Sequence, residues 1–166
     1  MGSVLGFCLS SLSTDNWIDI TALLINSILA GWVILVVQKN LANKRVLKDH
    51  FIGEIKDIQN EIKDFFKLVH SNKLPEATVL SWFKTLNIRI DDTMLEVNKK
   101  YKIDKTTLSP FQVELRNITT DSPEYISAFR SGNEITFSQA TKNAFYKFQQ
   151  DNMKLFNMLI ISINNK

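Results

Sequence analysis

Side chains that commonly act as catalysts or metal ligands are few in this chain, and their scarcity excludes several classes of enzyme. The 166 residues include two histidines, His50 and His70, and a single cysteine, Cys8. One cysteine can form neither an internal disulfide nor a cysteine-based metal site, and no glycine-rich phosphate loop or Ser/His/Asp order appears. We therefore predict no metal and no cofactor. The chemical pattern that remains is Arg45, four residues, and then His50.

The spacing of Arg45 and His50 resembles the motif of HEPN-type ribonucleases. In that family the arginine binds phosphate or stabilises the transition state, the histidine helps to activate the ribose 2′-hydroxyl, and two copies usually meet across a dimer. The resemblance implies that Arg45 and His50 are candidate catalytic residues. Their alternative roles are an orienting charge next to a membrane and an exposed helix residue. Because two helical residues five apart point about 140° away from each other, we favour a protein without enzymatic activity.

A second segment, Arg116-Asn117, looks like the start of the same motif and falls between two predicted helices. Asp121, Ser122 and Pro123 occupy the positions where its histidine would fall. The resemblance therefore implies a degenerate, inactive copy.

The composition indicates one largely helical domain with a local apolar segment. Hydrophobic residues make up 45% of the chain, and Gly and Pro number only five and three. The mean hydropathy of −0.06 excludes a protein with many membrane spans, and the scarcity of Gly and Pro favours an all-α fold. The net charge of +3 is too small to indicate nucleic-acid binding by itself.

The segment from Trp17 to Val37 is predicted to be a transmembrane helix, because its last 18 residues carry no charge. About 20 helical residues cross the hydrocarbon core of a bilayer. A signal peptide fits less well, since no basic residue precedes the segment and no small-residue cleavage site follows it.

The charges that flank the span predict its orientation. No basic residue precedes it, whereas four follow it closely: Lys39, Lys44, Arg45 and Lys48. The positive-inside rule therefore predicts an extracytoplasmic tail (1–16), a membrane helix (17–37) and a cytosolic helical domain (38–166) in a bacterial inner membrane.

Small and polar residues recur on one side of the span. Ala22, Asn26 and Ala30 are spaced by four, and Ser27 with Gly31 forms a small-xxx-small pair beside them. An amide near the middle of the hydrocarbon is costly without a partner, so this face predicts association with further copies or a water-filled lumen. The alternative is that Asn26 merely lowers the hydrophobicity of a single-pass anchor.

The residues after the span predict an amphipathic stalk. Apolar side chains recur every three or four positions up to Val69, with neither Pro nor Gly between Val37 and Leu47. The recurring residues are Leu47, Phe51, Ile55, Ile58, Ile62, Phe65 or Phe66, and Val69. The membrane helix is therefore expected to continue without a break into the cytosolic stalk.

Turn and cap signals divide the rest of the chain into further helices. We predict helices from Pro75 to about Tyr101, over 110–119 and over 123–131, with Gly132 as a C-cap. Ser109 and Ser122 are the expected N-caps of the two short helices, and Thr136 with Gln139 is the expected capping box of one last long helix.

The end of that last helix, Met158 to Ile163, is apolar on all sides and too short to span a bilayer. We expect it to be buried in the bundle or in a subunit interface, and a tail dipping into the membrane surface is the alternative.

Together, the single span, the basic residues after it, the helical cytosolic part and the degenerate HEPN-like motif resemble a known family. It comprises the small membrane accessory proteins encoded beside the RNA-guided RNA nuclease of type VI-B CRISPR systems. The resemblance implies an antiphage role, in which a homo-oligomer forms a membrane pore that depolarises the infected cell and enhances defence by the nuclease.

Two other functions stay open from the sequence. One is a membrane-tethered HEPN-like ribonuclease, and the other is a single-pass scaffold or regulator that recruits a cytosolic partner. A run of lysines around the end of the helix predicted from Pro75 to about Tyr101 leaves direct RNA binding open, although such a run is more often a solvated loop. The run comprises Lys99, Lys100, Lys102 and Lys105.

Overall fold

The computed structural model describes residues 14–166, and this range is almost entirely helical. The predicted all-α class is confirmed, since sheet within 14–166 is limited to one pair of two-residue strands. The chain divides into two compact units, with the boundary between Leu47 and Lys48. Cys8 and nearly all of the predicted extracytoplasmic tail (1–16) lie outside the described residues.

The N-terminal unit is built from helix alone in its described part. It contains α1 (Thr14–Trp32), the π-helical segment η1 (Val33–Val37) and the first turns of α2 (Gln38–Ser71). These elements follow one another without a non-helical residue, as the sequence predicted. The helix ends at Ser71 because Asn72 takes a left-handed backbone conformation with φ 53°.

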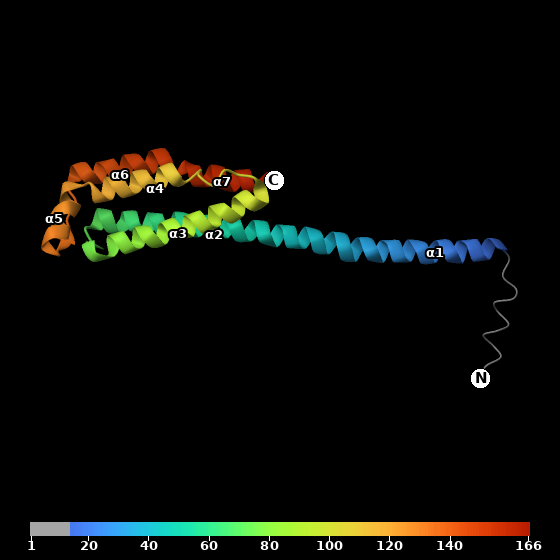
Figure 1. The fold of residues 1–166 in the computed structure, drawn as a ribbon. Coiled ribbons are helices and arrows are strands. Elements are labelled where there is room, and N and C mark those ends of the chain that lie inside the picture. The colour runs from blue at the N-terminus through green and yellow to red at the C-terminus, as the bar shows by residue number, and fades with distance from the viewer. Residues whose placement is uncertain (1–13) are drawn as a thin grey trace, which may run out of the picture. The chain divides into compact units, whose positions relative to one another are not determined.

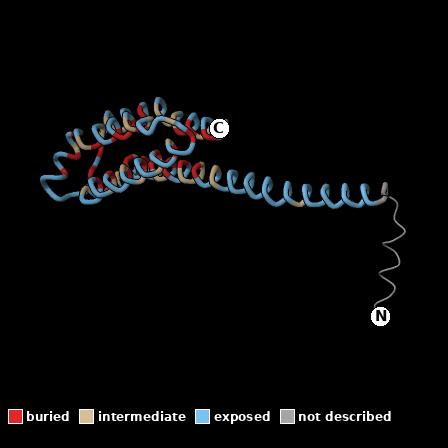
Figure 2. Tube along the Cα trace, turned by 45° about the vertical axis from the view of Figure 1, so that its right-hand side comes forward, coloured by how far each residue is buried: buried red, intermediate tan, exposed pale blue. Residues whose placement is uncertain are grey.

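The second unit, Lys48–Lys166, is a helical bundle. Besides the rest of α2 it contains α3 (Glu76–Tyr101), α4 (Ser109–Thr120), α5 (Pro123–Ser131), α6 (Gln139–Asn152) and α7 (Lys154–Asn164). Within the bundle, α2 and α3 lie side by side, α4 packs with α6 and α7 above them, and α5 crosses one end (Figure 1). The buried faces of these helices point toward one another (Figure 2).

Aromatic side chains fill the space between the two helix layers. The chain has 11 phenylalanines, and of those in the described range only Phe129 is exposed. Phe65 of α2 stacks on Trp82 of α3, with ring centroids 4.1 Å apart. Phe145 of α6 is fully buried, and its ring makes edge contacts with three other phenylalanine rings: Phe65, Phe66 and Phe137. These contacts join α2 to α6 and define the core of the bundle.

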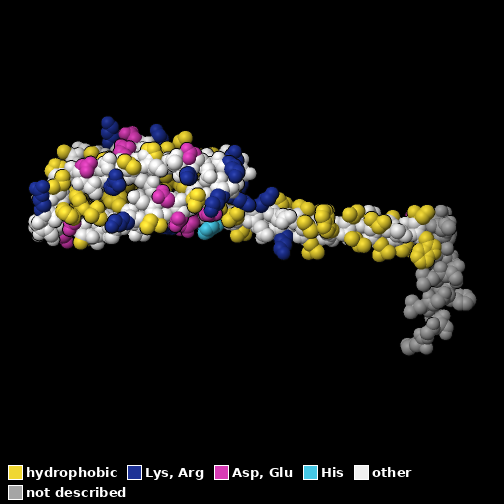
Figure 3. All heavy atoms as spheres, in the orientation of Figure 1, with side chains coloured by type: hydrophobic (Ala, Val, Ile, Leu, Met, Phe, Trp, Pro, Cys, Tyr) yellow, Lys and Arg dark blue, Asp and Glu magenta, His cyan; other side chains and the backbone are white. Residues whose placement is uncertain are grey.

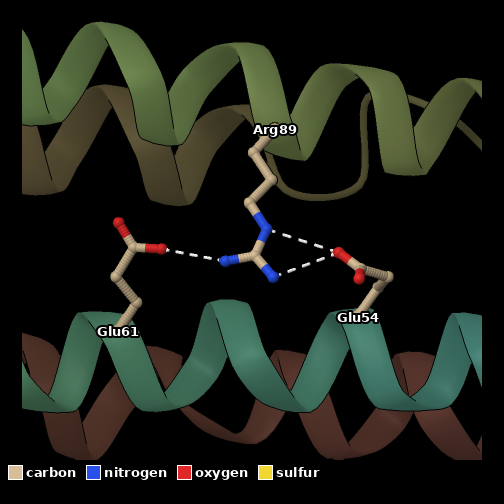
Figure 4. A network of polar contacts seen from close by, with 3 residues as sticks. All are labelled: Glu54, Glu61 and Arg89. Carbon is tan, nitrogen blue, oxygen red and sulfur yellow. Dashed lines mark hydrogen bonds and ion pairs between the residues drawn. The ribbon is translucent and has the colours of Figure 1, made fainter.

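A charged network links α2 to α3 at the side of this core (Figure 4). The Arg89 guanidinium donates to Glu61 Oε2 over 3.1 Å, and its Nη2 donates to Glu54 Oε2 over 3.1 Å. Glu54 and Glu61 are seven residues apart, so both lie on the face of α2 that points toward α3. All three side chains are about one third exposed, so the network positions the two helices more than it stabilises them.

Three predictions about the ends of the later helices were wrong. The N-cap of α6 is Ser138 rather than Thr136, and its Oγ accepts a hydrogen bond from the Thr141 N–H over 3.3 Å. Ser109 is inside α4, whose N-cap is the buried Leu108, because burial of that leucine fixes where the helix begins. The predicted last long helix is two helices that meet at Met153.

A short antiparallel ladder closes the end of the bundle near α5. Strands β1 (Leu74–Pro75) and β2 (Glu134–Ile135) pair Leu74 with Ile135, and both of these side chains are buried. The Asn72 side-chain oxygen accepts from the Phe137 N–H over 3.2 Å, which extends this connection. Pro75 therefore precedes α3 as its N-cap, rather than starting the first turn as expected.

Candidate membrane helix and polar sites

The α1 helix presents apolar side chains on all its sides. Leu23 and Ile28 are 69% and 70% exposed, Leu35 of the following η1 is 72% exposed, and none of the most apolar 18-residue window is buried. Figure 2 shows this helix as exposed along nearly its whole length. The core helix of a soluble protein is mostly buried, whereas no residue of the most apolar window of this helix is buried within the described chain. The helix is long and apolar enough to span a membrane, which confirms that part of the prediction.

The residues of the predicted association face all lie on α1, and their role in association stays a prediction. Ala22, Asn26 and Ala30 lie at successive helical turns and share a face about 80° wide. Ser27 and Gly31 continue this surface on one side. A Cβ added at Gly31 would meet no atom within 4 Å, so nothing inside the described chain requires a glycine there. The small side chains leave room for another helix backbone to approach.

The polar side chains of the apolar helix differ in how their hydrogen bonds are satisfied. Thr21 Oγ1 donates to the Trp17 carbonyl over 2.7 Å, and Ser27 Oγ donates to the Leu23 carbonyl over 2.8 Å. The Asn26 amide has no such partner among residues 14–166. In hydrocarbon, the two hydroxyls are therefore satisfied by their own helix, whereas the Asn26 amide requires a group from outside it.

The last turn of the predicted span departs from α-helical geometry. Residues Val33–Val37 form a π-helix, and four of these five residues are β-branched. Such side chains crowd the preceding turn of an α-helix, which gives a physical reason for the wider turn here. The sequence prediction of a regular helix over 17–37 did not include this change.

Comparison with known proteins identifies no relative of this chain. No family model matches the sequence, and no curated protein or solved structure is similar enough to count as a match. The functional argument therefore rests on the geometry of the chain's own residues, and the HEPN-like and accessory-protein assignments stay proposals.

Arg45 and His50 both belong to α2, but they fall on opposite sides of the boundary between the two units. Both side chains are exposed, and the His50 ring lies 5.5 Å from the ring of Phe51. On a helix the two side chains point about 140° apart. Their catalytic assignment stays a prediction, and the helix does not bring them together on one face.

Arg116 and Asn117 lie inside α4, near its C-terminal end, not between helices as expected. The Arg116 carbonyl accepts from Thr120 Oγ1 over 3.0 Å, which is ordinary helix-end bonding. Asn117 lines two open hollows of about 580 and 320 Å³, and neither is lined by an arginine or a histidine. The hollows thus lack the cation and the base that RNA cleavage of this kind requires.

Metal chemistry has no candidate site in the described range. Within residues 14–166, no group of three or more His, Cys, Asp or Glu side chains could hold a metal ion.

His70 has an unusual environment that its sequence context did not indicate. Its ring stacks on Tyr146 of α6, with ring centroids 3.8 Å apart and the planes 12° from parallel. Both ring nitrogens are buried, and neither has a hydrogen-bond partner among the described residues. Burial, and secondarily the charge of Lys142, lowers the pKa of His70 below its ordinary value of 6.5. The folded bundle therefore holds this histidine in the neutral form at neutral pH.

This environment predicts a pH-dependent stability. Between the lowered pKa of His70 and its ordinary value of 6.5, the unfolded chain binds more protons than the folded one. The free energy of unfolding therefore falls as the pH decreases through that window, and His70 adds no further loss below the lowered pKa. Urea unfolding at about pH 7.5 and 5.5 measures the effect, and His70→Phe is expected to reduce the difference between the two pH values. Equal pH dependence in wild type and His70→Phe would contradict the assignment.

Proposed function

We propose that this chain is a single-pass protein of the bacterial inner membrane whose α1 helix self-associates and permeabilises the bilayer. Its N-terminus lies outside and its helical bundle lies in the cytosol. The observation that carries the proposal is the Asn26 amide, which has no partner in residues 14–166 although it sits in the middle of an exposed apolar helix. A partner supplied by another copy, or by water in a lumen between copies, removes this cost.

Several features of α1 support association over a passive anchor. A passive anchor gains nothing from an amide, which lowers its hydrophobicity. In this chain Asn26 lies between two alanines spaced by one helical turn on each side, and such small residues allow a second helix to approach the amide closely. Gly31 provides a further close-approach position that no intramolecular contact uses. We extend the proposal to an antiphage role, in which an RNA-guided RNA nuclease is the functional partner. This extension rests on the resemblance to accessory proteins of type VI-B CRISPR systems.

The particle mass of the solubilised full chain tests the proposal. One copy has a mass of 19.1 kDa, and a pore requires several copies around a lumen. We expect light scattering in a mild detergent, corrected for bound detergent, to give a particle of more than two copies. A ring in electron micrographs would support it further. A monomer or dimer would contradict the pore and favour the single-pass scaffold.

A further inference from the structure

Three segments that are distant in sequence meet at one end of the helical bundle. Lys48, the first residue of the bundle, donates from Nζ to the Asn164 carbonyl at the end of α7 over 3.0 Å. The ring of Phe51 in α2 makes an edge contact with Tyr101 at the end of α3, with centroids 5.9 Å apart. The start of the bundle part of α2, the end of α3 and the end of α7 therefore share this end, which we call the entry end.

The entry end carries a surplus of positive charge. Lys99, Lys100, Lys102 and Lys105 are all exposed around the end of α3, and Figure 3 shows Lys and Arg side chains gathered where the bundle ends near the C-terminus. Of these, Lys99 is paired with Glu96 over 2.6 Å. The other three have no ion-pair partner among the described residues.

The lysines are held in place by a structured turn. Lys102 takes a left-handed conformation with φ 59°, and its N–H bonds to the Asn98 carbonyl over 2.9 Å. Asn98 Nδ2 donates to the Ile103 carbonyl over 2.7 Å. The Asp104 carboxylate accepts from the Thr106 N–H and hydroxyl, both over 2.9 Å, and these bonds lower the pKa of Asp104. The charge of Lys105 also lowers this pKa, so Asp104 offsets part of that charge, whereas Lys100 and Lys102 face solvent.

Apolar side chains accompany this charge. Met158 and Ile161 of α7 are 57% and 58% exposed, and Ile161 is three residues before the Asn164 carbonyl that binds Lys48. Of the predicted apolar segment 158–163, only Leu159 and Ile163 are buried in the bundle, and burial of the others in a subunit interface stays a prediction. Lysines beside exposed apolar side chains are typical of surfaces that rest in the headgroup region of an anionic membrane.

The geometry points to anionic phospholipid headgroups as the ligand of the entry end, an inference that rests on the membrane insertion proposed for α1. Lysine ammonium groups pair with the phosphates of anionic headgroups, and exposed apolar side chains at the same end of the bundle suit the boundary with the acyl chains. Single-stranded RNA fits less well, because its sites use exposed aromatic rings for base stacking and both Phe51 and Tyr101 are buried.

Lysine acetylation of the full-length wild-type chain in nanodiscs tests this inference directly. One set of discs contains phosphatidylcholine alone, and the other contains about 30% phosphatidylglycerol. We expect Lys100, Lys102 and Lys105 to react at least about fivefold more slowly in the anionic discs, as measured by mass spectrometry. High salt should remove this protection, because it screens exposed charges.

Three lysines remote from the entry end serve as internal controls. Lys67, Lys73 and Lys84 are exposed on α2, the following turn and α3, and their reactivity should not depend on the lipid. Lys99, which is next to these lysines and also exposed, is expected to share their protection. The triple variant K100Q/K102Q/K105Q should remove this protection of Lys99, whereas K67Q/K73Q/K84Q should keep it.

The outcomes separate this inference from the proposed function. Retention of the chain in the membrane at alkaline pH, together with equal lysine reactivity in both lipids, would overturn lipid docking and leave the membrane helix intact. Extraction of the chain at alkaline pH would overturn both proposals. Protection of the three lysines by added single-stranded RNA, but not by anionic lipid, would replace the membrane with RNA as the ligand.

Discussion

Replacing Phe145 with alanine is expected to lower the free energy of unfolding of the bundle by about 3–5 kcal/mol. The side chain is fully buried, and its ring touches Phe65, Phe66 and Phe137 at centroid distances of 5.5–6.5 Å. Its removal leaves a cavity between α2 and α6 that rigid neighbouring rings cannot fill. Urea unfolding of the full chain in detergent, followed by fluorescence, measures this loss.

The reporter for that experiment is Trp82, which stacks on Phe65 at 4.1 Å and so senses the same core. Trp17 and Trp32 are replaced by phenylalanine to remove their background. Phe129→Ala is the matched control, because it deletes the same atoms at a position that is 57% exposed. We expect this control to cost no more than about 1 kcal/mol. Similar losses for the two variants would contradict the aromatic core.

Replacing Asn26 with leucine is expected to abolish both self-association and membrane permeabilisation. A hydrogen bond between membrane helices contributes about 0.6–2 kcal/mol, so each interface in the oligomer weakens by about 3- to 30-fold. Because every interface of a closed oligomer loses this hydrogen bond, the free-energy losses add up over the whole assembly. The particle mass in detergent should fall toward that of one copy, 19.1 kDa, and membrane depolarisation during phage challenge should disappear.

Thr21→Val is the matched control for Asn26→Leu. Thr21 lies about 140° around the helix from Asn26, and its hydroxyl already bonds to the Trp17 carbonyl. Its loss should therefore change neither the particle mass nor the depolarisation. Asn26→Gln, which keeps an amide, should restore part of both. Undiminished depolarisation by Asn26→Leu would contradict the role assigned to this face.

Membrane association through two surfaces would explain why the chain carries charge and exposed apolar residues at the entry end. If α1 inserts and the entry end binds headgroups, as proposed, the bundle would be constrained at two places rather than tethered at one. Protonation of His70 would loosen the contact of α2 with α6 and so act on the bundle alone. Measurements on the lysines and on His70 therefore report on different parts of the molecule.

The amphipathic pattern was sufficient to predict most helices and their core faces. The end of α2 near Val69, the extent of α3 and the two short helices with the Ser122 N-cap and Gly132 C-cap all agree with the structure. These features depend on side-chain periodicity and on backbone preferences of Gly, Ser and Pro, which are local properties. The apolar character of 17–37 is equally local, because it requires only composition and length.

Features that depend on contacts between distant residues were not available from the sequence. The pairing of Leu74 with Ile135, the stacking of His70 on Tyr146 and the contact of Lys48 with Asn164 each join residues more than 50 positions apart. Ser138 and Thr136 are both possible N-caps of α6. The pairing of β2 ends at Ile135, immediately before Thr136, and the helix begins after Ser138. Asn26 could be identified from the sequence, because burying an unpaired amide among apolar residues is costly in any tertiary structure. The basic entry end emerged only when α3 and α7 packed back beside Lys48, because sequence distance carries no information about which lysines become neighbours.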